Sequence, residues 1–189
     1  EVQETVKLSG DRIGHVGQVV YGSLSKGDAA KLSVDSVNRG NTCKNHSATH
    51  LLQKALQLVL GEHVEQQGSY QDNARTRFDF SHSQAMSAEE IAKVEQMVNE
   101  KIAEDLAVVT EEMSIEDAKN KGAMALFGEK YGASVRVVSM GDFSMELCGG
   151  THVKRTSDIA FFKILSESGV SAGVRRIEAL TGANVMAYY

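Results

Sequence analysis

Two short pairs of residues carry the chemistry that this sequence suggests. His46 and His50 are four positions apart, and Cys148 and His152 repeat that spacing far downstream. Zinc favours imidazole nitrogen and thiolate sulfur as ligands, and such ligands usually come as closely spaced pairs, because each pair then requires little extra ordering of the chain. Together the two pairs predict one metal centre that joins distant parts of the sequence.

Neither pair identifies a metal site by itself. Histidines at this spacing often occur by chance, and a single cysteine is usually a small buried apolar residue. A zinc protease with both histidines on one helix needs Glu directly after the first histidine, where this chain has Ser47. Cys43 could compete as a ligand, but we expect it to lie on an unstructured approach and to point away. We interpret the isolated histidines as surface or structural residues: His15, His63 and His82.

The candidate ligands need a helix and a loop to position them. Apolar residues recur at three- and four-residue spacing over 51–60, which predicts a buried amphipathic helix with Asn45 as its N-cap that ends at Gly61. His46 and His50 would share one face of this helix. Four protein ligands would favour an orienting or structural metal, whereas three would leave a position open for chemistry, and the sequence does not choose.

The remaining pattern mixes strands and helices. Residues 1–40 alternate in short runs, including "KLSVDSV" (31–37), and predict a partial, barrel-like β module, with a second domain over 41–189. A hairpin over 67–81 and three further strands are expected, over 134–140, 159–166 and 173–180. Helices are expected from Ser87 through Leu106, from Ser114 towards Gly122, and at the end, from 183. This order predicts an α+β fold with antiparallel sheets packed around a central helix.

Composition limits the function classes. The chain has 189 residues, 42% of them hydrophobic and 24% charged, as in a globular protein with a real core. A net charge of −5 argues against a general electrostatic hold on nucleic acid, and two cysteines suit a reducing compartment. We found no apolar run of membrane-spanning length and no secretion leader, so the expected location is the cytoplasm, without membrane partners. Because the chain starts at Glu1 and stops in a helical pattern, we expect a piece of a longer protein.

Four ordered motifs resemble the editing domain of alanyl-tRNA synthetases. They are "NHSATHLL" (45–52), "RFDFSH" (77–82), "ELCGGTHV" (146–153) and "GVRRIEALTG" (173–182). Free-standing trans-editing proteins share this domain in outline, and threonyl-tRNA synthetases share it more distantly. The resemblance implies hydrolysis of Ser-tRNA and Gly-tRNA wrongly made on tRNA(Ala), with Zn²⁺ held by the residues that match the family's ligands: His46, His50, Cys148 and His152.

The resemblance also implies partners and missing parts. The partners would be the acceptor end of tRNA(Ala) and the rest of the parent synthetase. Because the adenylate-forming domain and the oligomerising region of the family are missing, we expect a monomeric fragment that cannot make aminoacyl-tRNA.

An activation site shaped for alanine rejects glycine or serine by only about 1–3 kcal/mol, so a second, hydrolytic site is needed. Thr49 and Gln66 resemble family positions that line this site, and our hypothesis is that Thr49 binds the serine hydroxyl. Without the resemblance, Thr49 would be a hydroxyl bonded to its own helix and Gln66 an ordinary loop amide. Arg175 and Arg176 alternate faces of a strand, so we expect one to face the substrate and the other to be solvated. The expected catalytic residues are Thr49, Gln66 and Cys148, and the expected substrate contacts are Thr49, Gln66, Gly149, Gly150 and Arg175.

Two other functions fit these motifs. In one, zinc only joins helix to loop in a non-catalytic RNA-binding module, with Arg75, Arg77, Lys154 and Arg155 as the RNA contacts. In the other, the domain edits Ser-tRNA(Thr) in the threonyl manner, which uses the same paired ligands. "CGGTH" and "GVRRIEALTG" favour the alanyl type, and hydrolysis of charged tRNA separates an enzyme from a binding module.

Overall fold

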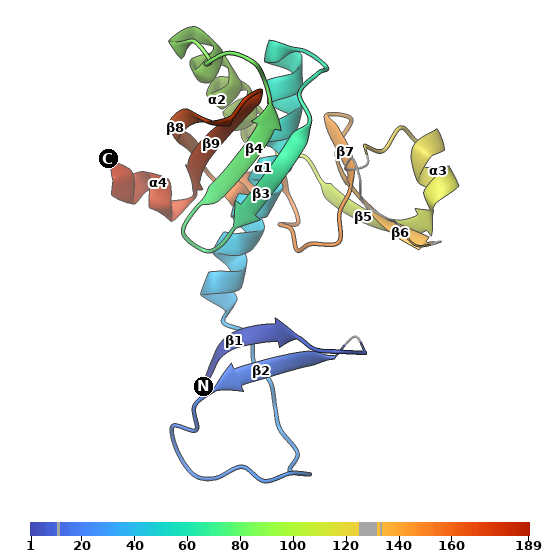
Figure 1. Ribbon diagram of the computed structural model, residues 1–189, viewed down its shortest axis with the longest axis vertical. Coiled ribbons are helices and arrows are strands. Elements are labelled where there is room, and N and C mark those ends of the chain that lie inside the picture. The colour runs from blue at the N-terminus through green and yellow to red at the C-terminus, as the bar shows by residue number, and fades with distance from the viewer. Residues whose placement is uncertain (11, 125–131, 133) are drawn as a thin grey trace. The chain divides into compact units, whose positions relative to one another are not determined.

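The computed structural model describes residues 1–10, 12–124, 132 and 134–189, which form two compact units, Glu1–Val34 and Asp35–Tyr189. Within the described part of the first unit, β1 (Val2–Lys7) and β2 (Ile13–Gly17) form an antiparallel hairpin (Figure 1). The strand expected over 31–37 is wrong, since residues 18–34 are described as turns and irregular chain and a helix begins at Ser36. The alternating apolar and polar residues over 31–37 form no strand because no described strand pairs with them.

The central helix α1 (Ser36–Leu60) begins ten residues earlier than the sequence predicted. Its N-cap is Asp35, whose carboxylate accepts the N–H groups of Val37 (2.9 Å) and Asn38 (3.0 Å). Asn45, the predicted cap, is instead fully buried within the helix. Its amide donates to the carbonyl of Asp72 at 2.8 Å. The Asn45 side chain therefore makes tertiary hydrogen bonds and does not cap the helix.

Asp35→Ala should destabilise the protein by about 1 kcal/mol, because the first turn of α1 loses the acceptor for two backbone N–H groups. Asp35→Asn, which keeps a side-chain oxygen at the cap, should lose less. Urea unfolding followed by circular dichroism measures both variants. Equal midpoints for Asp35→Ala and the original protein would show that this cap contributes nothing to stability.

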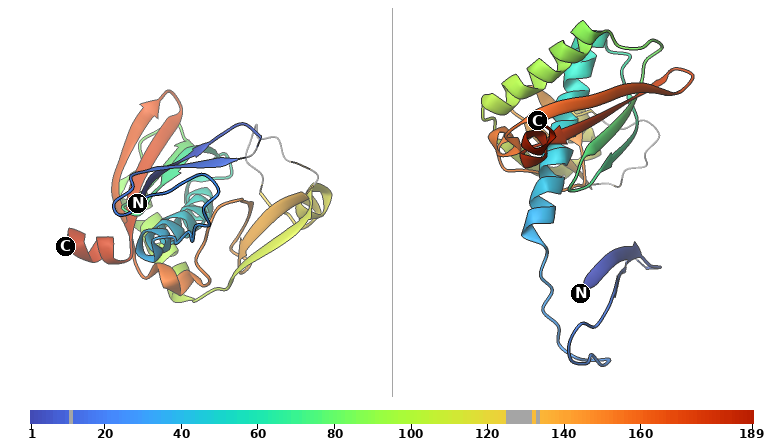
Figure 2. Two further views of the ribbon diagram at one scale, coloured as in Figure 1. Left: turned by 90° about the horizontal axis from the view of Figure 1, so that it is seen from below. Right: turned by 90° about the vertical axis from the view of Figure 1, so that its left-hand side faces the viewer.

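The larger sheet has the strand order β3-β4-β9-β8 and is antiparallel throughout. Its strands are β3 (Gln66–Gln71), β4 (Thr76–Ser81), β8 (Phe162–Ser171) and β9 (Val174–Thr181). One face packs on α1 and on α2 (Ala88–Ala103) (Figure 2). Alternate residues of the central strands, such as Phe78, Phe80 and Ile177, fill the core there. The predicted hairpin is confirmed, and so is the capping box between Ser87 and Glu90.

The smaller sheet has the order β5-β6-β7, with strands β5 (Val108–Ser114), β6 (Ser134–Met140) and β7 (Ser144–Leu147). The described residues of this unit also form three shorter helices: α3 (Ile115–Asn120), the 3₁₀ helix η1 (Thr156–Ile159) and α4 (Ala183–Tyr188). In the second unit α1 contacts β3, β4 and β9 of one sheet and β7 of the other (Figure 1). The predicted α+β fold around a central helix is confirmed.

Two further element boundaries were predicted wrongly. The helix expected to reach Leu106 ends at Ala103, because Asp105 adopts a positive φ of 54° and binds Arg155 through its carboxylate. The strand expected from Ile159 begins at Phe162, since η1 occupies the preceding residues. None of the helices described here has the length and apolar character needed to cross a membrane.

Candidate metal centre

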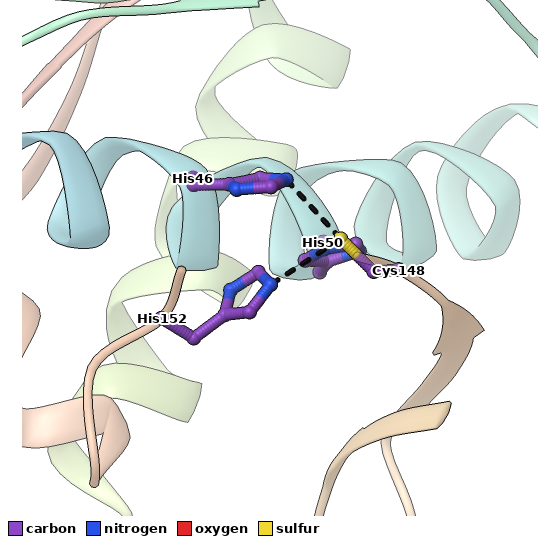
Figure 3. Close-up of side chains that lie close together, drawn as sticks. All are labelled: His46, His50, Cys148 and His152. Atoms are coloured by element: carbon purple, nitrogen blue, oxygen red, sulfur yellow. Dashed lines mark hydrogen bonds between the residues drawn. The ribbon is translucent and has the colours of Figure 1, made fainter. Parts of the chain in front are cut away.

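The structure brings the four predicted ligands together. α1 presents His46 and His50, and the loop after β7 presents Cys148 and His152 (Figure 3). The nearest ligand atoms of the four residues all lie within 4.8 Å of one another. Cys148 Sγ is 3.4 Å from His46 Nε2 and 3.3 Å from His152 Nε2. Tetrahedral zinc, with bonds of about 2.0–2.3 Å, separates its ligand atoms by roughly 3.3–3.8 Å, so both distances fit a shared metal.

His50 provides a test of that fit. Its side chain is buried, and Nε2 has no hydrogen-bond partner among the described residues. The other ring nitrogen, Nδ1, lies 2.6 Å from Glu146 Oε2. Leaving a buried polar atom unpaired costs about 1–3 kcal/mol, and a metal ion beside Nε2 would remove that cost. The donor set, one sulfur and three imidazoles, is one that zinc prefers.

Gly150 allows His46 to approach the loop. A Cβ atom at position 150 would lie 2.1 Å from Cε1 of His46, whereas a Cβ at Gly149 would meet nothing within 4 Å. The Gly150 N–H points to Cys148 Sγ at 3.4 Å, and the carbonyl of Gly150 accepts a hydrogen bond from Arg136. One glycine of the pair is therefore required by close packing, and its N–H group already contacts a ligand atom.

The electrostatics of the cluster favour a thiolate. Burial acts to raise the pKa of the Cys148 thiol, but the contacts with His152 and His46 and the nearby charge of His50 outweigh it and hold that pKa far below its usual range. Burial also lowers the pKa of His152. For His50, burial opposes protonation, yet the Glu146 carboxylate overcomes it and raises the pKa. Cys148 is thus in the charged form that binds metal ions at neutral pH.

The proposed serine-binding residues lie outside the ligand group. Thr49 is only 3% exposed, and its hydroxyl donates to the carbonyl of Asn45 at 2.9 Å and lies 2.7 Å from the Thr76 hydroxyl. The amide that reaches Thr49 is that of Gln71, at 3.3 Å. Gln66 is half-buried on β3 and donates to Ser69 at 3.4 Å.

Both arginines of β9 are held by carboxylates. Arg175 makes two hydrogen bonds to Glu167, at 2.5 and 2.7 Å, and Arg176 makes two to Asp79, at 2.6 and 2.7 Å. The expectation that one of them is simply solvated is wrong, because carboxylates on the neighbouring strands β8 and β4 lie within reach of each guanidinium.

Three further expectations need correction or addition. Cys43 lies within α1 itself and not on an unstructured approach, because the helix starts earlier. His63 and His82 are not isolated, since His63 Nε2 is 2.9 Å from His82 Nδ1. Sequence reasoning also missed the outer partners of the ligands, Glu146 and Ser47. A charged residue at a buried strand position was the available signal for Glu146.

Comparisons with known proteins identify relatives of this chain. A family model described as "Threonyl and Alanyl tRNA synthetase second additional domain" matches residues 135–178. The chain is 62% identical over its full length to alanine–tRNA ligase 1 of Lachnoclostridium phytofermentans. It is 55% identical, over 99% of its length, to alanine–tRNA ligase of Nitrosomonas europaea. It spans 22% of the length of each of these relatives.

Proposed function

The chain belongs to the alanyl-tRNA synthetase family and corresponds to its editing domain. From this premise we propose that it hydrolyses the ester bond of tRNA(Ala) that has been wrongly charged with serine or glycine. We assign the activity to the unit Asp35–Tyr189, which contains the whole ligand cluster. The observation that carries the proposal is this cluster of one thiolate and three imidazoles, part of which lies in the segment matched by the family model.

Zn²⁺ is the metal that we propose for the cluster, held by His46, His50, Cys148 and His152. When bound, it would supply positive charge that orients the aminoacyl group and its ester carbonyl. Four protein donors fill a tetrahedral site, so orientation fits the geometry better than activation of a metal-bound water. The substrate would then depend on the chain's own polar groups for contacts to its amino acid and terminal adenosine.

We propose that Thr49 binds the serine hydroxyl of the substrate. Its contact with Gln71 is the longest of its three, at 3.3 Å, and is the one that a substrate hydroxyl would most easily replace. Gln66 and Arg175 complete the proposed contacts. Arg175 uses Nε and Nη2 for Glu167, and among the described residues no partner takes Nη1, which could then bind a substrate oxygen.

Thr49→Val should reduce hydrolysis of Ser-tRNA(Ala) relative to Gly-tRNA(Ala), because valine keeps the shape but removes the hydroxyl that pairs with serine. Loss of such a hydrogen bond costs about 1–3 kcal/mol, which is roughly a 5- to 150-fold fall in rate. Thr42→Val is the matched control, since Thr42 lies on the same helix and bonds only to the carbonyl of Asn38 among the described residues. A Thr49→Val protein with unchanged serine preference would contradict this role.

The direct test of the function is deacylation of Ser-, Gly- and Ala-tRNA(Ala) by this chain, with and without added Zn²⁺. Hydrolysis of the serine and glycine esters, with Ala-tRNA(Ala) spared, is the expected result. The closed, four-donor cluster also favours a second candidate, a non-catalytic module in which the metal joins α1 to the loop. Absence of hydrolysis in a folded, metal-loaded sample would select that candidate.

A further inference from the structure

We propose that Glu146 and Ser47 are positioning residues that turn the rings of His50 and His152 so that each presents Nε2 to the metal. This inference rests on the metal site proposed above. Glu146 and Ser47 are 5% and 0% exposed, and each contacts the ring nitrogen that the cluster does not use. Neither would touch the metal itself.

Glu146 determines the orientation of His50. A carboxylate can only accept hydrogen bonds, so Nδ1 of His50, 2.6 Å from Oε2, must carry a proton and donate it. In the neutral ring Nε2 then has a free lone pair, and this is the buried atom without a partner among the described residues. The carboxylate is itself held, since Oε1 is 3.4 Å from the Ser144 hydroxyl. The main chain of Glu146 pairs with Val138 on β6.

Ser47 holds the ring of His152 from the opposite element, and its hydroxyl accepts from Nδ1 when Nε2 binds the metal. Its Oγ lies 3.1 Å from His152 Nδ1 and also accepts the backbone N–H of Val153 at 3.1 Å. One side chain on α1 thus fixes both the ring of His152 and the backbone directly after it. With Nδ1 occupied in this way, Nε2 faces Cys148 Sγ at 3.3 Å.

The two contacts have a common consequence. Glu146 is on β7, directly before the ligand loop, and Ser47 is on α1. Each of these two segments therefore holds a histidine that the other segment supplies. Outer hydrogen bonds of this kind fix the tautomer and the ring orientation, and their loss typically lowers metal affinity about 10–100-fold.

The experiment measures Zn²⁺ affinity by chelator competition, and Co²⁺ binding by visible absorption, for the original protein, Ser47→Ala and Glu146→Gln. We expect about 10–100-fold weaker binding for each variant. Glu95→Gln is the matched control, since Glu95 is a partly buried carboxylate that pairs with Lys163 away from the cluster. It should bind both ions as tightly as the original protein, even if its melting temperature falls.

Nitrogen-15 NMR of the histidine rings in the Zn²⁺-loaded original protein gives a readout that requires no variant. His50 and His152 should both show a protonated Nδ1 and a metal-bound Nε2. Metal bound through Nδ1 of either ring would overturn the proposal, and so would unchanged affinity in both variants. If the original protein binds neither ion, the proposed metal site is wrong, and so are the positioning roles that depend on it. If the original protein and both variants bind the metal equally tightly, the metal site stands and only the positioning roles are wrong.

Discussion

Cys148→Ala is expected to abolish editing, with hydrolysis of Ser-tRNA(Ala) falling roughly 100-fold or more. The Cys148 sulfur contacts several members of the cluster: it lies within 3.4 Å of Nε2 of both His46 and His152, and it accepts the N–H of Gly150. Its thiolate form also supplies the only negative charge among the four ligands. Alanine would leave three imidazoles without the thiolate charge and with one ligand position vacant, and Zn²⁺ affinity should fall together with the activity.

The chain provides the control for this measurement. Cys43, the other cysteine, lies on α1 and is not among the four ligands. Cys43→Ala should therefore retain both Zn²⁺ binding and hydrolysis, which shows that loss of a thiol as such is harmless. A zinc-loaded Cys148→Ala protein that still hydrolyses Ser-tRNA(Ala) at the original rate would contradict the four-ligand site and would favour one with an open position for chemistry.

The parts of this structure that the sequence predicts well depend on local rules. Two histidines at helical spacing in front of an apolar run must share a face of α1. Ser87 and Ser114 cap α2 and α3 because serine followed three residues later by an acidic residue satisfies free N–H groups at a helix start. Alternation over 134–140 corresponds to β6, which pairs with β7, the strand directly before the ligand loop.

The parts that the sequence misses depend on partners far away in the chain. Asn45 was interpreted as a helix cap because it is polar and precedes apolar residues, but its partner is a carbonyl at Asp72. Glu146 and Ser47 have no local pattern that assigns them to histidines, because each meets its ring about a hundred residues away. Motif spacing therefore identifies the metal ligands, whereas only the fold identifies the residues that orient them.

Gly150→Ala should remove metal binding as effectively as loss of a ligand. The added Cβ would overlap the His46 ring, since 2.1 Å is far less than any contact between carbon atoms. The carbonyl of Gly150 is held by Arg136, which restrains the loop, so the ring must swing out of the cluster. We expect Zn²⁺ affinity to fall on the order of 100-fold and deacylation to fall with it. Overpacking should also cost about 1–3 kcal/mol of stability.

The adjacent glycine separates this steric effect from a general effect on loop flexibility. Gly149→Ala adds the same methyl group one residue earlier, where nothing lies within 4 Å, and should keep its Zn²⁺ affinity. Calorimetric titration of Zn²⁺ into the two metal-free variants compares them directly. If both lose affinity equally, the loop needs glycine for its flexibility and the close approach of His46 is not the cause. If only Gly150→Ala loses it, the second glycine of "CGGTH" is required because the first histidine of α1 occupies the space that a side chain would need.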